Sequence, residues 1–109
     1  MKIISRPRQA GKTTELIDMA EKRGGYIVCH SIKEAQRIFH TAKEQGKNIN
    51  LPITYEDLLG ERYHGQGIKE FYIDNADYLL QRLTAVPIEA ISVNEPTNSK
   101  LQGGGDADS

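Results

Sequence analysis

Hydrophobic and polar positions divide the chain into short apolar blocks separated by amphipathic segments. Residues 2–5, 26–30 and 70–74 are rich in β-branched and aromatic side chains, as strands buried on both faces are. Between the first two blocks, apolar residues recur at helical spacing from Thr13 until the pair Gly24 and Gly25. This order of strand, helix and strand is typical of a parallel sheet with helical crossovers.

Capping residues predict two further helices. Ser31 and Glu34 form a capping box, in which the Ser31 hydroxyl and the Glu34 carboxylate can satisfy the first amides of a helix that ends near Gln45. Thr54, with Asp57 three residues later, predicts a helix of one or two turns. Both helices would begin directly after an apolar block.

The rest of the pattern predicts two more strands and one more helix. Residues 48–53 alternate apolar side chains around Pro52, which favours a short edge strand. Residues 76–83 have helical spacing, and Pro87 separates them from a last apolar block at residues 88–93. We therefore expect an α/β fold, a three-layer sandwich with a small, mostly parallel sheet and right-handed crossovers.

Composition limits the domain organisation and the cellular setting. We expect one domain over residues 1–93 and a disordered tail over residues 94–109, because the tail is polar, Gly-rich and without periodicity. Hydrophobic residues make up 38% of the chain and charged residues 27%, and no apolar run is long enough for a membrane span. Since the N-terminus lacks the pattern of a signal peptide, we expect a cytoplasmic protein.

Positive charge is concentrated at the start of a chain whose net charge is −1. Lys2, Arg6, Arg8 and Lys12 give the first twelve residues four positive charges and no acid. Such a cluster suits phosphate, and composition does not choose between a nucleotide and a nucleic-acid backbone.

The stretch "RPRQAGKTTE", residues 6–15, contains the second half of a phosphate-binding loop. Gly11 would let the backbone approach a phosphate, Lys12 would reach the outer phosphates, and the Thr13 hydroxyl would ligate Mg²⁺. Arg6 occupies the position of the first glycine in the full pattern. The alternative is a well-capped helix whose first residues only resemble such a loop.

Asp74 is the candidate acidic partner of this loop. It ends the apolar block at residues 70–74, and ligands of open α/β sheets collect at the carboxyl ends of strands. Lys12 and Asp74 are therefore the candidate catalytic residues, although Asp74 could instead cap the next helix. Asn75 follows where hydrolysing enzymes often have a glutamate, and an amide cannot accept a proton. Binding is better supported than turnover, and three acids could replace the missing base without the spacing selecting one: Glu56, Glu70 and Asp77.

Three stretches together give the chain a family resemblance: "RPRQAGKTT", "YIVCHSIKEAQRIF" and "FYIDNAD". Over residues 1–93 the chain resembles the RecA-like ATPase domain of P-loop NTPases, especially the helicases and the phage terminase large subunits. The resemblance implies ATP or GTP with Mg²⁺ as ligands. It places Thr13 and Asp74 at the metal, and it implies a nucleotide site formed by Gln9, Ala10, Gly11, Lys12, Thr13 and Thr14.

Two classes of function follow from these observations. The first is a nucleotide-binding protein, which the resemblance would place in phage DNA metabolism, with slow Mg²⁺-dependent hydrolysis left open by Asn75. The alternative is a non-catalytic P-loop fold that binds another protein, such as a host ATPase or defence protein, or a second copy of itself. Direct DNA binding through the basic N-terminus stays open, and Arg62 or Arg82 is either an arginine finger or solvated surface charge.

Overall fold

Three parallel strands form the sheet of this protein, whose structure is a computed structural model that describes residues 1–5, 11–63 and 67–94. The sheet order is β2-β1-β3, with Val28 paired to Ile53 on one side and to Ile73 on the other. The elements are, in chain order, α1 (Lys12–Arg23), β1 (Tyr26–Cys29), α2 (Ile32–Glu44), β2 (Ile53–Thr54), α3 (Tyr55–Leu59), β3 (Phe71–Ile73) and α4 (Ala76–Gln81). The α/β class and the parallel sheet predicted from the sequence are confirmed.

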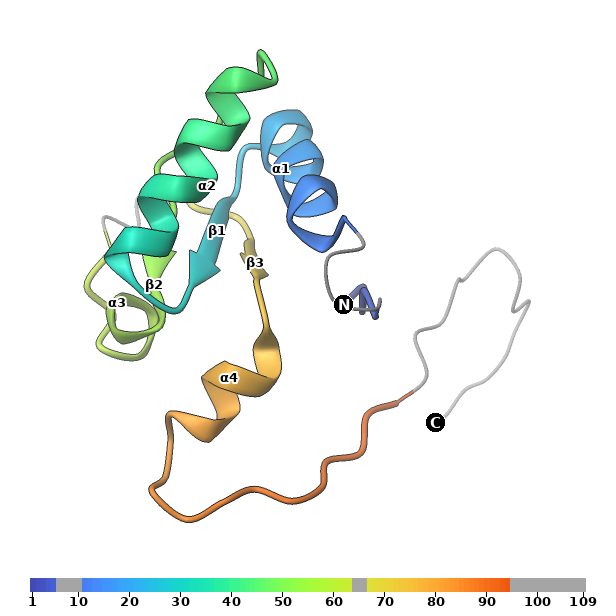
Figure 1. The fold of residues 1–109 in the computed structure, drawn as a ribbon, viewed down its shortest axis with the longest axis vertical. Helices are drawn as coiled ribbons and strands as arrows, with labels where there is room; N and C mark the ends of the chain where they lie inside the picture. Colours follow the sequence, from blue (N-terminus) through green and yellow to red (C-terminus); the bar gives the residue numbers. More distant parts are fainter. Residues whose placement is uncertain (6–10, 64–66, 95–109) are drawn as a thin grey trace.

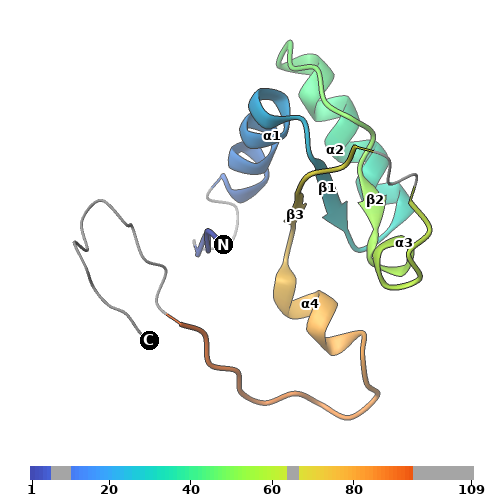
Figure 2. The ribbon, with the colours of Figure 1, turned by 180° about the vertical axis from the view of Figure 1, so that it is seen from behind.

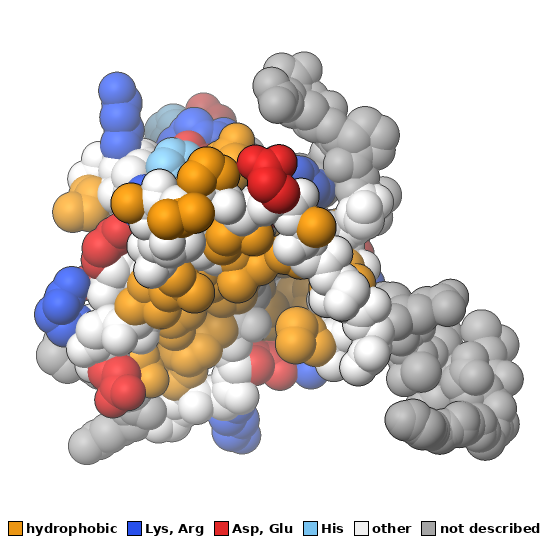
Figure 3. Space-filling model, turned by 90° about the horizontal axis from the view of Figure 1, so that it is seen from below, with side chains coloured by type: hydrophobic (Ala, Val, Ile, Leu, Met, Phe, Trp, Pro, Cys, Tyr) orange, Lys and Arg blue, Asp and Glu red, His pale blue; other side chains and the backbone are white. Residues whose placement is uncertain are grey.

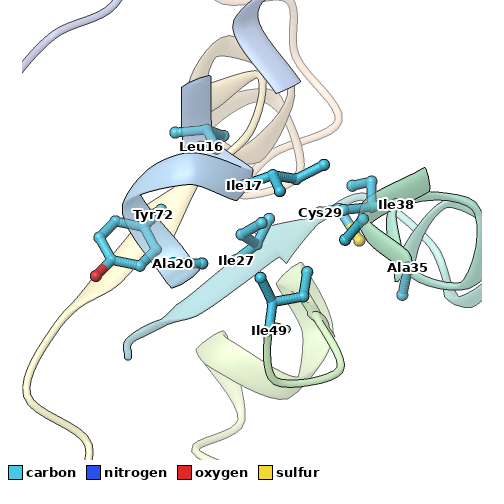
Figure 4. Packing of buried hydrophobic residues seen from close by; sticks show 10 residues of the cluster. Leu16, Ile17, Ala20, Ile27, Cys29, Ala35, Ile38, Ile49 and Tyr72 are labelled. Atoms are coloured by element: carbon cyan, nitrogen blue, oxygen red, sulfur yellow. The ribbon is translucent and has the colours of Figure 1, made fainter. Parts of the chain in front are cut away.

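The two long helices, α1 and α2, pack on the same face of the sheet (Figures 1 and 2). Ile27 and Cys29 of β1 point into this layer and are fully buried. Figure 4 shows them between side chains of both helices, and the buried cluster consists of Leu16, Ile17, Ala20, Ile27, Cys29, Ala35, Ile38, Ala42, Ile49 and Tyr72. This cluster therefore fills the space between one sheet face and the two long helices, while Val28 and Tyr55 are fully buried outside it.

The second face of the sheet carries no long helix within the described residues. The connection from β2 to β3 contains the five-residue helix α3, which contacts β1. Val28 points to this face, since side chains alternate along a strand, and it is fully buried. Tyr63, from the same connection, packs edge-on against Phe71 with ring centroids 5.2 Å apart.

The helix boundaries follow the predicted capping residues. Gly11 and Gly24 flank α1 with positive φ angles of 86° and 82°, a backbone region that glycine enters without a steric penalty. Thr54 and Asp57 form the complete capping box of α3. At α2 only half of the predicted box forms: the Glu34 amide donates to the Ser31 hydroxyl at 3.1 Å, but the Glu34 carboxylate binds Arg37 instead.

Two predicted strands are wrong. Residues 2–5 are not a strand; Ile4 packs against the core, whereas Lys2 forms an ion pair with Glu15 of α1 at 2.9 Å. Residues 88–93 are extended and exposed without strand pairing. The Gln81 side chain accepts from the Ile88 amide and donates to the Val86 carbonyl, each at 2.9 Å, so it occupies backbone groups at the start of the expected strand.

Three other predicted elements are confirmed with shorter bounds: the strands at residues 26–30 and 70–74 appear as β1 and β3, and the helix at residues 76–83 appears as α4. Of the strand predicted at residues 48–53 only Ile53 is in a strand, because β2 begins there and ends at Thr54. Pro52 shortens β2 to two residues, since proline has no amide to donate to the ladder. The tail beyond residue 94 lies outside the described residues. Within the described ranges, no helix is long and apolar enough to cross a membrane.

Candidate functional site

Lys12, Asp74 and Asn75 meet at the carboxyl edge of the sheet although the chain separates them by about sixty residues. The Lys12 ammonium, at the first residue of α1, donates to the Asn75 side-chain oxygen at 3.2 Å across a separation of 63 residues. All three residues line a hollow of about 800 Å³. Residues 1–5, α1 and β3 form its other walls, together with Ile91. The sequence places Lys12 and Asp74 in one crevice; both line this hollow, and the hydrogen bond of Lys12 goes to Asn75.

Asp74 is a buried acid without a counter-ion in contact. Its exposed fraction is 3%, and within the described ranges no hydrogen bond or ion pair joins its carboxylate to another residue. Burial raises the pKa of this carboxyl, and Glu34 adds to the rise. Lys12 and Arg37 oppose it. A carboxylate held in this way has unused capacity to accept hydrogen bonds or to bind a cation.

The Tyr55 side chain holds the backbone of the turn formed by Asp74 and Asn75. Tyr55 is the first residue of α3, directly after β2, and its side chain is fully buried. Its hydroxyl shares its one proton between the Asp74 carbonyl and the Asn75 carbonyl, the latter at 2.9 Å. Burial, together with the Asp74 charge, raises the pKa of this phenol, so it stays a donor at neutral pH. Sequence analysis missed this residue.

Asn75 adopts a left-handed backbone conformation, with φ 56° and ψ 62°. Asparagine is among the few residues that enter this region at low cost. The Tyr78 amide donates to the Asn75 carbonyl at 2.9 Å, so the turn leads directly into α4. The turn places the Asn75 amide beside Lys12, a contact that the sequence did not indicate.

His30 is a further polar residue at the same edge of the sheet. It follows β1 directly, and its ring meets the Tyr78 ring edge-on with centroids 6.4 Å apart. Its Nδ1 atom is buried and has no hydrogen-bond partner in the structure as described. The signal that could have indicated His30 is its position: parallel strands place the residues that follow them at one edge, as they do for Asp74.

The remaining predicted site residues are distributed as follows. Gln9 and Ala10 lie outside the described residues. Gly11 forms the N-cap of α1, and Thr13 and Thr14 follow Lys12 in its first turn, Thr13 half-buried and Thr14 exposed. Of these residues at the start of α1, Lys12 lines the hollow and Gly11, Thr13 and Thr14 do not.

The three acids that could replace the missing general base differ in their contacts. Glu56 pairs with Arg82, and Glu70 pairs with Arg23 and accepts from the Tyr72 hydroxyl. Asp77 lines the hollow and has no ion-pair partner among the described residues. It is therefore the acid of the three that is free to act there.

The two candidate finger arginines are both engaged with neighbouring groups. Arg82 donates to the His30 carbonyl at 3.0 Å, and its guanidinium lies 5.4 Å from the centre of the Tyr55 ring. Arg62 lies 3.9 Å from the Asp57 carboxylate. These contacts give both arginines a structural role.

A metal site made only of protein side chains is not present in the described part of the chain, where no three metal-binding residues cluster. Magnesium does not require one, because it commonly binds one or two carboxylates, substrate phosphates and water. The unpaired carboxylate of Asp74 fits that mode of binding.

No protein-family model matches this chain, and comparison with curated proteins and with solved structures finds no match.

Proposed function

We propose that this protein binds a nucleoside triphosphate with Mg²⁺ in the hollow beside Lys12 and Asp74. The observation that carries the proposal is one hollow lined both by Lys12, at a helix N-terminus, and by Asp74, a buried residue at a strand end whose carboxylate has no partner among the described residues. The free amides at the start of α1 favour an anion, and Lys12 adds a positive charge next to them. A hollow of about 800 Å³ falls within the usual range for small-molecule sites.

Asp74 would hold the metal, and Lys12 would bind the phosphates. A bound Mg²⁺ would stabilise the negative charge of the phosphates, and it would offset the free-energy cost of burying the Asp74 carboxylate. Thr13 is not part of this assignment, because it does not line the hollow. Asn75 cannot act as a base, and so the proposal is for binding, with any turnover depending on Asp77.

The test is ligand-induced stabilisation of the fold. Saturating Mg-ATP or Mg-GTP should raise the free energy of unfolding by about 2.7 kcal/mol at a hundredfold excess over the dissociation constant. Lys12→Ala should abolish that gain, whereas Lys22→Ala, an exposed position on the same helix, should keep it. Absence of any gain in the wild type with either nucleotide would refute the proposal.

A second candidate function, protein binding or self-association, is favoured by the apolar surface at the lower side of the molecule. Figure 3 shows hydrophobic side chains gathered across this face. Four large apolar residues at or after the end of α4 are each more than half exposed: Leu83, Val86, Ile91 and Val93. Sedimentation velocity discriminates the two candidates: self-association that Lys12→Ala leaves unchanged, without nucleotide binding, supports this one.

A further inference from the structure

Asn75 presents two unused hydrogen-bond donors beside Lys12. Its side-chain oxygen must face Lys12, because an ammonium group can only donate. The amide nitrogen therefore points elsewhere, and neither of its two N–H groups has a partner within the described residues. Asn75 also lines the hollow. One cation and one amide thus face the same space.

The position of this amide is fixed by the fold. The left-handed backbone of Asn75 is held by the Tyr55 hydroxyl at 2.9 Å and by the Tyr78 amide at 2.9 Å. Because the backbone is anchored on both sides and the side chain is held by Lys12, the donors need little reorganisation to meet a ligand. Pre-ordered donors of this kind lose less entropy on binding than mobile ones.

The charge at this position matters as much as the donors. An aspartate at position 75 would lie about as close to Lys12 as the asparagine does, and its ion pair would compete with a bound phosphate. It would also repel the phosphate and add a second carboxylate next to the buried Asp74. A neutral amide avoids both effects.

We propose that Asn75 is a ligand-contact residue that donates to the same phosphate group as Lys12. This inference rests on the proposed function. It gives Asn75, which stands where a hydrolysing enzyme would have its general base, a role in binding the ligand. The ligand class is a polyphosphate, either a nucleoside triphosphate or pyrophosphate. Because pyrophosphate has no nucleobase, comparing the affinities of the two ligands shows how much of the binding comes from the phosphates alone.

The test compares Asn75→Gly and Asn75→Asp by calorimetric titration with Mg-ATP and with Mg-pyrophosphate. Glycine and aspartate both tolerate the left-handed backbone, so both variants should fold, and the melting temperature without ligand checks this. Loss of a hydrogen bond to a charged group should weaken binding about tenfold in Asn75→Gly. Asn75→Asp should weaken it about a hundredfold, because repulsion is added.

Asn48→Asp is the control for charge, since Asn48 is exposed on the loop after α2. This variant should bind like the wild type. Equal affinity of the wild type and either Asn75 variant overturns the inference while leaving the proposed function intact. Failure of the wild type to bind Mg-ATP, Mg-GTP and Mg-pyrophosphate overturns both.

Discussion

Replacement of Tyr55 by phenylalanine removes one hydroxyl from beneath the candidate site. Among the described residues, that hydroxyl is the only hydrogen-bond partner of the Asp74 carbonyl. The Asn75 carbonyl keeps a second partner, the Tyr78 amide at 2.9 Å. The substitution therefore leaves one buried carbonyl unsatisfied, which costs about 1–3 kcal/mol.

A cost of about 2 kcal/mol lowers the melting temperature of a domain of this size by roughly 8–16 °C. Thermal unfolding followed by circular dichroism measures this shift. Tyr78→Phe is the matched control, because the Tyr78 ring is 51% exposed and its hydroxyl has no partner in the described part of the chain. If the two variants unfold within about 0.5 kcal/mol of each other, Tyr55 does not anchor the turn.

The other predictions concern the acid of the site and the core. Asp74→Asn should stabilise the protein without ligand near neutral pH, because burial and Glu34 raise the pKa of the native carboxyl above its unfolded value. Because burial penalises the charged carboxylate in the native state, this gain in stability should disappear as the pH falls through the native pKa toward the pKa of the unfolded state. Urea unfolding at several pH values measures the free energy of unfolding of both proteins. A gain that persists in acid contradicts the reasoning. Ile38→Ala should cost about 2–5 kcal/mol, since Ile38 is fully buried. Ile32→Ala, 69% exposed in the same helix, should cost less than about 0.5 kcal/mol, and equal losses in urea unfolding would contradict the assigned core.

The sequence predicted the elements whose signals are local. The caps at Ser31 and Thr54 and the stop at Gly24 depend on hydrogen bonds and backbone angles within a few residues, and all three appear in the structure. Strand β1 was predictable for a similar reason, since a continuous apolar run needs cover on both faces. These signals do not depend on where the rest of the chain lies.

The elements that the sequence misplaced depend on long-range pairing. Residues 2–5 and 88–93 have strand-like composition, but a strand forms only where an edge is available and the backbone groups are free. At residue 88 the Gln81 side chain already holds the amide. Similarly, no local pattern reveals that the Tyr55 hydroxyl reaches a turn 20 residues later.

Three unfavourable features coincide at the carboxyl edge of β1 and β3. Asp74 is a buried residue whose carboxylate has no hydrogen bond or ion pair among the described residues. Asn75 has a positive φ angle, and the His30 Nδ1 is a fully buried atom without a hydrogen-bond partner in the described part of the chain. The buried carboxylate and the unpartnered Nδ1 cost free energy in the absence of ligand, and the positive φ angle adds a small cost even for asparagine; a fold selected for stability alone would not collect them in one place. A cation bound at Asp74 would offset the cost of its buried charge. Phosphate oxygens at Lys12 and Asn75 would use the side-chain position that the left-handed backbone of Asn75 sets. The position of these costs is therefore an argument for a ligand at this edge that does not depend on the sequence motif.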